Sequence, residues 1–208
     1  MTRPAAERLL LGGPAGNIET AIDFPETEAR GVALVAHPHP LFGGTLDNKV
    51  AQTLARVFYE MGYIALRPNF RGVGASEGVH DEGRGEVDDM VAVIAYARQR
   101  FGELPVALAG FSFGAFVQTR VAKLVKPERM ALVGTSVTRS AAETVPPDTI
   151  LIHGELDETV PLAEVMVWAL PQELPVVVIP GADHFFHRRL HIIRNIVNSM
   201  WHARAQQA

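Results

Sequence analysis

The chain has 208 residues, of which 48% are hydrophobic and 20% charged, and its formal net charge is −4 at pH 7. This composition is typical of one globular domain with a substantial core, and we expect a single domain over residues 1–208. The slight negative charge argues against a nucleic-acid or membrane surface built on Lys and Arg, and the absence of Cys excludes disulfides and a cysteine nucleophile.

Short apolar runs alternate along the chain with longer amphipathic segments. The stretches RLLL and IETAIDF, within the first thirty residues, predict an antiparallel pair at a sheet edge. Buried strands are predicted over Gly31–His37, Tyr63–Asn69, Pro105–Phe111, Met130–Ser136, Thr149–Gly154 and Pro175–Gly181. Helices are predicted over Leu46–Met61, Glu82–Phe101, Gly114–Leu124, Leu162–Leu170 and His184–His202. This alternation predicts an α/β fold with a mainly parallel sheet and helices on both faces.

The stretch ALAGFSFGAF contains the pattern G-x-S-x-G with Ser112 at its centre. A predicted strand leads into Gly110 and a predicted helix begins at Gly114, which is the context that a nucleophilic serine on a sharp strand-to-helix turn requires. Glycines on either side would let the strand and the helix approach closely. The alternative is a glycine-rich turn that contains an incidental serine.

A serine hydroxyl becomes a nucleophile only with a base beside it, and the base needs an orienting acid. In this arrangement the acid and then the histidine follow the serine along the chain. Asp157 and His184 each come directly after a predicted strand, where catalytic groups of open α/β sheets collect. The order Ser112, Asp157, His184 therefore predicts a catalytic triad, with Glu155 and Asp183 as competing acids.

Five motifs occur in a fixed order: HPHPLFGG, RPNFRGVGASEG, GFSFG, HGELD and GADHFF. With this ordered set the chain resembles the α/β-hydrolases, and in particular small predicted serine hydrolases, from about residue 31 to the C-terminal helix. The resemblance implies the α/β-hydrolase fold, with a mostly parallel eight-stranded sheet. It also implies a Ser–Asp–His triad, carried over onto Ser112, Asp157 and His184.

Acyl transfer builds negative charge on a carbonyl oxygen, which two backbone N–H groups would stabilise. We expect one from Phe113, the residue after the nucleophile. The other is expected from the loop HPHPLFGG, in which Pro38 stands where many relatives have glycine. Since Pro38 and Pro40 have no N–H group, the donor is His39 or Leu41, and the resemblance to His-Gly-x-Pro loops favours His39.

Several large apolar residues lie near the predicted triad, although most such residues belong to a core. Of these, we expect Leu41 and Phe113 to contact the substrate. Between Ser136 and Thr149 the chain has only a short, polar, proline-broken stretch. We therefore expect no lid domain and a site open to water.

Two groups of histidines are candidate metal ligands: His37 with His39, and His184 with His187 and His191, which lie near one face of the predicted C-terminal helix. A zinc site needs a closed set of mutually placed ligands, and the chain has no Cys to complete one. We therefore expect no metal.

The stretch RGVGASEG has three glycines, but the third comes one residue late for a dinucleotide fingerprint. We interpret it as a loop that Arg71 ties to its surroundings, and we expect no cofactor. The longest uncharged run, residues 104–119, is too short and too interrupted by Pro and Gly to span a membrane. With no secretory leader apparent in the N-terminal residues, we expect a cytoplasmic protein.

The sequence thus predicts a lidless serine hydrolase that acts on small or accessible carboxylic esters through an acyl-enzyme. An acyl-thioesterase or an aminopeptidase-like amidase would use the same residues, and both alternatives stay open. A non-catalytic member of the fold, binding a small molecule or a protein, is a third alternative; loss of a triad group would mark it, and none is lost. The oligomeric state does not follow from the sequence.

Overall fold

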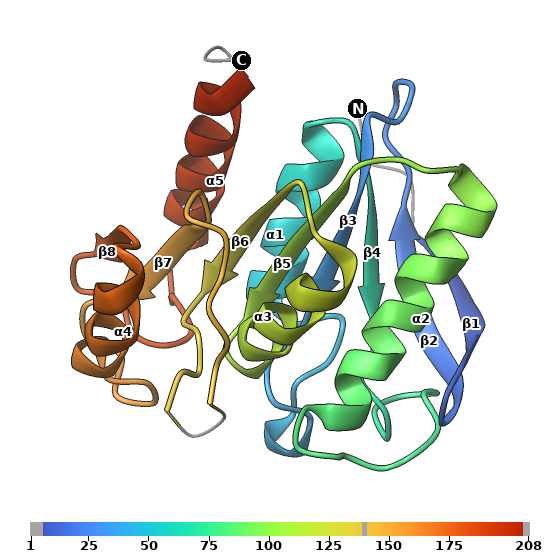
Figure 1. The fold of residues 1–208 in the computed structure, drawn as a ribbon, viewed down its shortest axis with the longest axis horizontal. Helices are drawn as coiled ribbons and strands as arrows, with labels where there is room; N and C mark the ends of the chain where they lie inside the picture. Colours follow the sequence, from blue (N-terminus) through green and yellow to red (C-terminus); the bar gives the residue numbers. More distant parts are fainter. Residues whose placement is uncertain (1–5, 139–140, 206–208) are drawn as a thin grey trace.

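The structure, a computed structural model, describes residues 6–138 and 141–205. Its centre is an eight-stranded sheet with the strand order β1-β2-β4-β3-β5-β6-β7-β8 (Figure 1). The strands are β1 (Glu7–Gly13), β2 (Gly16–Asp23), β3 (Gly31–Ala36), β4 (Tyr63–Pro68), β5 (Val106–Phe111), β6 (Arg129–Val133), β7 (Ile150–Gly154) and β8 (Val176–Ile179).

Parallel pairing dominates the sheet, as the strand and helix alternation predicts. β1 pairs with β2, and β2 with β4, in antiparallel fashion, whereas every pairing from β4 through β8 is parallel. All residues of β3 through β7 are buried, which explains why their sequences are near-continuous apolar runs rather than alternating patterns. The predicted antiparallel pair at the start of the chain is confirmed.

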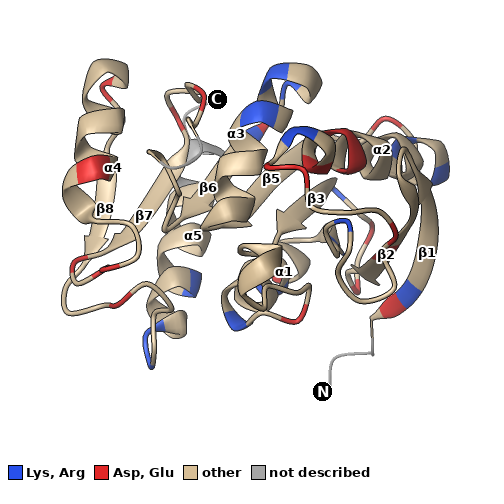
Figure 2. Ribbon diagram, turned by 90° about the horizontal axis from the view of Figure 1, so that it is seen from below, with Lys and Arg blue, Asp and Glu red and all other residues tan. Residues whose placement is uncertain are grey.

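Five helices cover the two faces of the sheet. They are α1 (Lys49–Glu60), α2 (Arg84–Phe101), α3 (Phe113–Val125), α4 (Leu162–Ala169) and α5 (Leu190–Ala205), with two short 3-10 helices, η1 (Pro40–Phe42) and η2 (Leu170–Gln172). Figure 2 shows α1 and α5 on one face, and α2, α3 and α4 on the other. Each face has its own apolar core, so the sheet is buried between two helical layers.

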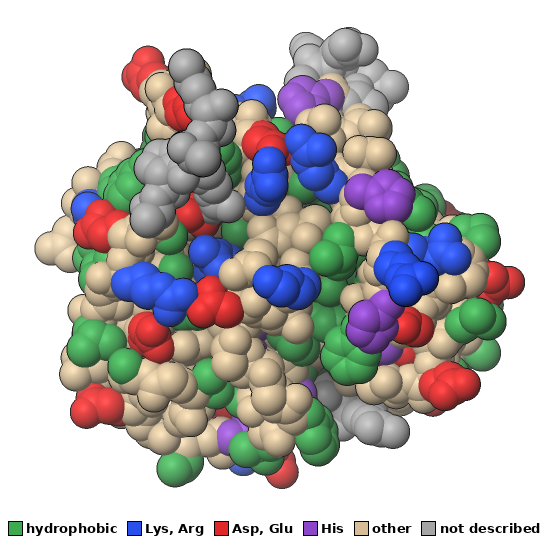
Figure 3. Space-filling model, turned by 180° about the vertical axis from the view of Figure 1, so that it is seen from behind, with side chains coloured by type: hydrophobic (Ala, Val, Ile, Leu, Met, Phe, Trp, Pro, Cys, Tyr) green, Lys and Arg blue, Asp and Glu red, His purple; other side chains and the backbone are tan. Residues whose placement is uncertain are grey.

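Charged side chains of both signs are interspersed on the molecular surface. On the face opposite to that of Figure 1, Lys and Arg side chains lie among Asp and Glu side chains (Figure 3). This mixture agrees with the slight formal charge of the chain.

The C-terminal helix begins six residues later than the periodicity predicts, at Leu190 instead of His184. Phe186 and Arg188 have backbone φ angles of 54° and 61°, which a right-handed helix does not contain. Phe186 is also fully buried, so the segment is a loop folded back onto the core rather than an exposed helical turn. The prediction of a helix over residues 184–189 is therefore wrong, and His184 lies in a loop.

The start of α1 also differs from its prediction, by three residues. Asn48 caps the helix, because its side-chain oxygen accepts hydrogen bonds from the backbone N–H groups of Val50 and Ala51 at 2.9 and 3.3 Å. The predicted helix includes the apolar Leu46, but this residue lies before the cap and is buried outside the helix.

The connection between β6 and β7 carries no helix in its described residues, 134–138 and 141–149. This connection agrees with the prediction that the protein has no lid domain. Across the described ranges, every helix is too short or too polar to cross a lipid bilayer.

Candidate active site

Ser112 occupies a sharp turn between β5 and α3. Its φ angle is 55°, a left-handed conformation that is uncommon for residues with a Cβ and that costs free energy. A Cβ on Gly114 would collide with the carbonyl oxygens of His37 and Ala36, and a Cβ on Gly110 would lie 2.6 Å from the backbone nitrogen of Ala115. The glycines of the motif are thus required where the strand, the turn and the helix approach one another.

The structure brings the three predicted triad residues together from three separate loops. The His184 Nε2 atom lies 3.0 Å from Ser112 Oγ, and its Nδ1 atom lies 2.7 Å from Asp157 Oδ2. The three residues are 5–8% exposed, so these contacts are largely shielded from bulk water. The Phe111 ring packs against the His184 ring, with 5.0 Å between the ring centroids.

Asp157 is held in place by donors on both of its oxygens. Its Oδ1 atom accepts hydrogen bonds from the backbone N–H groups of Thr159 and Val160, at 2.9 and 2.8 Å. Its Oδ2 atom, which faces His184, also lies 3.4 Å from Nε2 of His153. These contacts fix the carboxylate opposite the imidazole of His184.

His153 is a site residue that the sequence analysis missed. It is completely buried, and burial lowers its pKa, so the ring is neutral. Its Nε2 atom lies 2.8 Å from the Val160 carbonyl oxygen, so Nε2 carries the proton of the neutral ring and donates it to that oxygen. The available signal was its place in HGELD, four residues before Asp157, but the contact depends on a turn that the pattern does not specify.

The two competing acids make contacts elsewhere. Glu155 accepts a hydrogen bond from the Gly181 N–H group at 2.7 Å. Asp183 lies 2.6 Å from Nδ1 of His187, and this hydrogen bond lowers the pKa of the Asp183 carboxyl. Asp157 is the acid that contacts His184.

His37 connects the loop after β3 to the loop after β4. Its Nε2 atom accepts a hydrogen bond from the Phe70 N–H group at 3.0 Å, and its Nδ1 atom lies 2.7 Å from the Pro38 carbonyl oxygen. Burial lowers the pKa of His37 to about 4, so the ring is neutral at pH 7 with its proton on Nδ1. This histidine orders the loop that leads to His39.

His39 lies beside Phe113, and their ring centroids are 4.7 Å apart. The His39 Nδ1 atom accepts a hydrogen bond of 3.3 Å from the Leu41 N–H group, which closes the loop on itself. All peptide bonds of the described residues are trans, including those that precede Pro38 and Pro40. Because the Leu41 N–H group donates to the His39 ring, it is occupied within the loop. The His39 residue itself lies next to Phe113.

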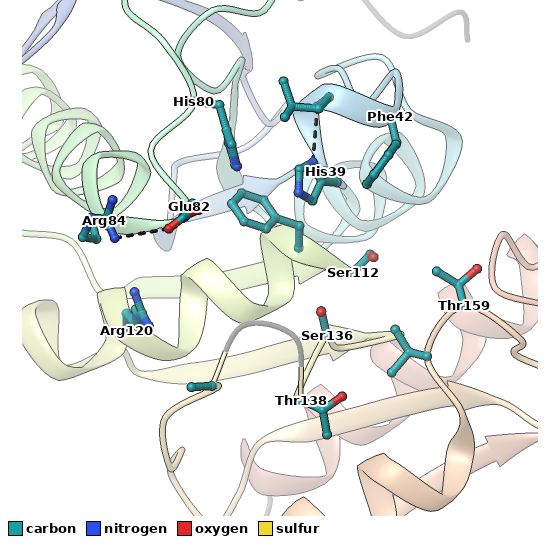
Figure 4. A pocket seen from close by; sticks show the side chains of 14 residues that line it. His39, Phe42, His80, Glu82, Arg84, Ser112, Arg120, Ser136, Thr138 and Thr159 are labelled. Carbon is teal, nitrogen blue, oxygen red and sulfur yellow. Dashed lines mark hydrogen bonds and ion pairs between the residues drawn. The ribbon is translucent and has the colours of Figure 1, made fainter.

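A cavity of about 770 Å³ opens directly over Ser112 (Figure 4). Its lining residues are His39, Leu41, Phe42, His80, Glu82, Arg84, Ser112, Phe113, Arg120, Ser136, Thr138, Ala141, Thr159 and Val160. Leu41 is 68% exposed and Phe113 only 3%, and both line this space; that they contact a substrate stays a prediction.

Comparison with known proteins places the chain in a family. Residues 16–160 match the family described as X-Pro dipeptidyl-peptidase (S15 family). The chain belongs to this family of α/β-hydrolases. An uncharacterized protein of Rickettsia prowazekii (strain Madrid E), RP471, is 30% identical over 207 residues, which cover 92% of this chain and 87% of that protein.

Two solved structures share the whole architecture. XC6422 from Xanthomonas campestris, an α/β serine hydrolase without a lid, is 34% identical with a TM-score of 0.89, over 96% of this chain and 95% of that one. An α/β serine hydrolase homologue from Coxiella burnetii is 37% identical with a TM-score of 0.87, over 96% and 99% of the two chains. The protein is thus an α/β serine hydrolase of the lidless type.

The remaining sequence features of this α/β-hydrolase have structural explanations. The guanidinium of Arg71 contacts Asp89 at 2.8 Å and the Gly85 carbonyl oxygen at 2.7 Å, so the interpretation of RGVGASEG as a tied loop is confirmed. His187 and His191 are exposed, and His187 precedes α5, so they share no helix face with His184. In the described part of the chain, no three His, Asp or Glu side chains are grouped to hold a metal ion.

Proposed function

We propose that the protein hydrolyses carboxylic esters, with Ser112 as nucleophile, His184 as general base and acid, and Asp157 as the orienting acid. The observation that carries this proposal is the unbroken chain of contacts from Ser112 Oγ through His184 to Asp157, at 3.0 and 2.7 Å, below an open cavity. These distances are those over which a base takes a proton from a serine hydroxyl.

In the first half of the reaction, Ser112 Oγ attacks the ester carbonyl carbon while His184 Nε2 takes its proton. Asp157 holds the imidazole with Nε2 toward Ser112 and stabilises the imidazolium that forms. His184 then donates this proton to the leaving alcohol, and the acyl group stays on Ser112.

In the second half, water attacks the acyl-enzyme, and His184 again serves as the base. The acid leaves as Ser112 recovers its proton. Ser112, His184 and Asp157 account for every proton transfer, and we propose that no cofactor takes part.

The oxyanion would be stabilised by the backbone N–H groups of Phe113 and His39. Phe113 is the first residue of α3, so its N–H group has no acceptor within the helix. The Leu41 N–H group donates to the His39 ring, which favours His39 over Leu41 as the second donor. Loss of one such donor typically lowers kcat about 10²-fold or more.

A peptidase is the second candidate, because the family match is to an X-Pro dipeptidyl-peptidase family. The same triad would cleave an amide, with an amine in place of the alcohol as the leaving group. An acyl-thioesterase would likewise use the same atoms. We favour oxygen esters because the cavity is open to water and lined by Leu41 and Phe113, which would contact a small acyl group.

The test measures turnover of a short-chain oxygen ester, the matching thioester and a dipeptidyl amide with proline in its second position. The variant Ser112→Ala is compared with Ser136→Ala, since both serines line the cavity but only Ser112 contacts His184. We expect the oxygen ester to be hydrolysed fastest, with turnover lost in Ser112→Ala and retained in Ser136→Ala. Fastest cleavage of the amide would favour the peptidase, and wild-type turnover in Ser112→Ala would exclude the triad.

A further inference from the structure

We infer that the cavity over Ser112 selects esters whose acyl half carries an aromatic ring. This inference rests on the proposed ester hydrolase function and names its substrate class. The observation behind it is a group of four rings in the cavity lining, which we call the aromatic wall: His39, Phe42, His80 and Phe113. Figure 4 shows three of them, His39, Phe42 and His80, on the same side of the cavity.

The rings of the aromatic wall contact one another, with His39 at the centre. The centroid of the His39 ring lies 4.7 Å from that of Phe42, 4.9 Å from that of His80 and 4.7 Å from that of Phe113. The three ring pairs are tilted, with interplanar angles of 50°, 43° and 46°. The rings come from three separate segments, which are the loop after β3, the loop before α2 and the first residue of α3. The fold therefore assembles one continuous surface of rings beside the nucleophile.

The aromatic wall is accessible from the cavity. Phe42 is 82% exposed, and the His39 and His80 side chains are partly exposed. Only Phe113, which follows Ser112 in the chain, is nearly buried. Rings that served only as core would be buried throughout, whereas a large exposed ring at the edge of a cavity is typical of a binding surface.

Both loops that supply the aromatic wall are held in place. The Phe42 N–H group donates to the His39 carbonyl oxygen at 3.1 Å, which fixes these two residues in the tight turn η1. The Nδ1 atom of His80 lies 2.9 Å from Oε1 of Glu86, a fully buried carboxylate. Glu86 also accepts hydrogen bonds of 2.9 and 2.8 Å from two backbone N–H groups of the loop before α2. The rings are thus positioned before a substrate arrives, which lowers the entropic cost of binding.

Small side chains face the aromatic wall. Figure 4 shows Ser136 and Thr138 across the cavity from His39 and Phe42. The other small lining residues are Ala141, Thr159 and Val160. Since none of these side chains is long, they leave space in front of the wall for a flat group.

A saturated chain and a cation are the competing ligands. A saturated chain would gain only the burial of apolar area, whereas an aromatic ring adds the favourable interaction of tilted or edge-to-face ring pairs. A cation would look for Glu82, but this carboxylate already contacts Arg84 at 3.3 Å. Cation–π sites are also built from Trp, Tyr and Phe faces, and two rings of the wall are imidazoles. The wall therefore favours an aromatic group.

The acyl half of the ester, rather than the alcohol half, would meet the aromatic wall. The leaving alcohol takes its proton from His184, whose ring contacts Phe111 and Phe185. Among the described residues, the cavity lining includes Ser112 but none of these three. The alcohol therefore leaves on the His184 side, and the cavity with its wall is left for the acyl group.

Methyl 3-phenylpropionate and methyl 3-cyclohexylpropionate test this assignment, because they have the same number of carbon atoms and differ only in the aromaticity of the ring. Two methylene groups separate the ring from the carbonyl, so the intrinsic reactivities match, and burial alone would favour the more apolar cyclohexyl ring. We expect kcat/KM for the phenyl ester to be about fivefold higher, in line with the strength of aromatic pairs.

Variants of the exposed ring locate this preference in the aromatic wall. In Phe42→Leu the ratio of the two kcat/KM values should fall at least by half, and Phe42→Tyr, which keeps a ring, should retain it. Phe185→Leu is the matched control, because Phe185 is also exposed and lies near the triad but is absent from the described cavity lining. It should change both rates by the same factor and leave the ratio unaltered. An unchanged ratio in Phe42→Leu would contradict the role of the wall.

Equal rates for the two methyl esters, or faster turnover of the cyclohexyl ester, would overturn the inference while leaving the ester hydrolase intact. A preference seen only for benzyl acetate over cyclohexylmethyl acetate would overturn the assignment to the acyl half. Binding to Ser112→Ala, followed by NMR titration, tests the same preference without turnover. Tighter binding of the phenyl ester, weakened when Phe42→Leu is added, supports the inference even if neither ester is hydrolysed. Equal affinities for the two methyl esters would contradict it.

Discussion

His153 shows how a residue without contact to the substrate can affect the chemistry. Its Nε2–H group donates to the Val160 carbonyl oxygen at 2.8 Å, and the Nε2 atom also lies 3.4 Å from Asp157 Oδ2. The positive end of this N–H dipole, near Asp157 Oδ2, limits how strongly the carboxylate attracts the proton of His184. His153 is therefore a positioning residue for the proposed triad, and it acts on His184 through Asp157.

Replacing this donor should be measurable in kinetics. For His153→Leu we expect kcat to fall about tenfold with KM unchanged, because substrate contacts remain while Asp157 loses a partner. We also expect the acid limb of the pH–rate profile to move to higher pH, since a less compensated carboxylate holds the His184 proton more tightly. His153→Gln keeps an N–H donor and should recover part of both effects. A lower kcat with an unmoved acid limb would indicate a purely structural role.

His37 gives the protein a defined dependence of stability on pH. Its pKa is about 4 in the folded state and near 6.5 when the chain is unfolded. Between these values the unfolded chain binds the extra proton, so the free energy of unfolding decreases as the pH falls through this window. From about pH 7.5 to about pH 5, this single group accounts for a loss of about 2 kcal/mol.

Urea denaturation at these two pH values measures the effect. We expect the variant His37→Gln to be less stable than the wild type at neutral pH, because it loses the hydrogen bonds of the ring. Its free energy of unfolding should decrease by about 2 kcal/mol less than that of the wild type over the same pH interval. His191→Gln, which replaces an exposed histidine, is the control and should behave as the wild type. An equal decrease in His37→Gln and wild type would show that His37 titrates normally in the folded protein.

At the level of elements, the approach of α3 to β3 determines where Ser112 is placed. Gly114 lies against the backbone of His37 and Ala36, where no side chain can move aside to make room. A methyl group there must separate the helix from the strand, and with it Ser112 from the loop that carries His39.

Gly114→Ala should therefore lower the free energy of unfolding by about 2 kcal/mol, within the range of overpacked cores, and reduce ester turnover at the same time. Gly12→Ala is the matched control, because nothing lies within 4 Å of a Cβ at that position. Urea denaturation and a rate measurement on both variants check this. Wild-type stability of Gly114→Ala would mean that the two elements are less closely packed than described.

The helices and strands were predictable from the sequence where one feature, such as a continuous apolar run, dominated a segment. The strands from β3 to β7 are buried on both faces, so their apolar runs identified them within one to three residues. The contacts among Ser112, Asp157 and His184 were predictable because each residue lies in the turn or loop that follows a strand. The loop 184–189 was not predictable, since its positive φ angles at Phe186 and Arg188 arise from tertiary packing and not from Gly or Asn in the sequence. The position of His153 beside Asp157 depends on the turn between them, which the spacing of the residues does not reveal.

At the scale of the whole molecule, the open cavity over Ser112 is the distinguishing feature. The described residues between β6 and β7 form no helix that could cover it, and Phe42 on its rim is 82% exposed. Access to the proposed nucleophile therefore requires no movement of a lid.

Turnover should accordingly show no interfacial activation. When the concentration of a short-chain ester is raised past its solubility limit, we expect the rate to follow one saturation curve. The reason is that a site without a lid gains nothing from a lipid–water interface. Initial rates on both sides of the limit, with an emulsified long-chain ester as comparison, measure this. A sharp rise in rate at the limit would reveal a covering segment.

The central claim is that His184 and Asp157 activate Ser112 as a nucleophile, and a fluorophosphonate probe tests it most directly because it requires no knowledge of the substrate. The folded protein is treated with the probe, digested and mapped by mass spectrometry. The account predicts one phosphonylated residue, Ser112, with labelling lost in His184→Ala and retained in Ser136→Ala. An unlabelled Ser112 in folded protein, or equal labelling in His184→Ala, would contradict it.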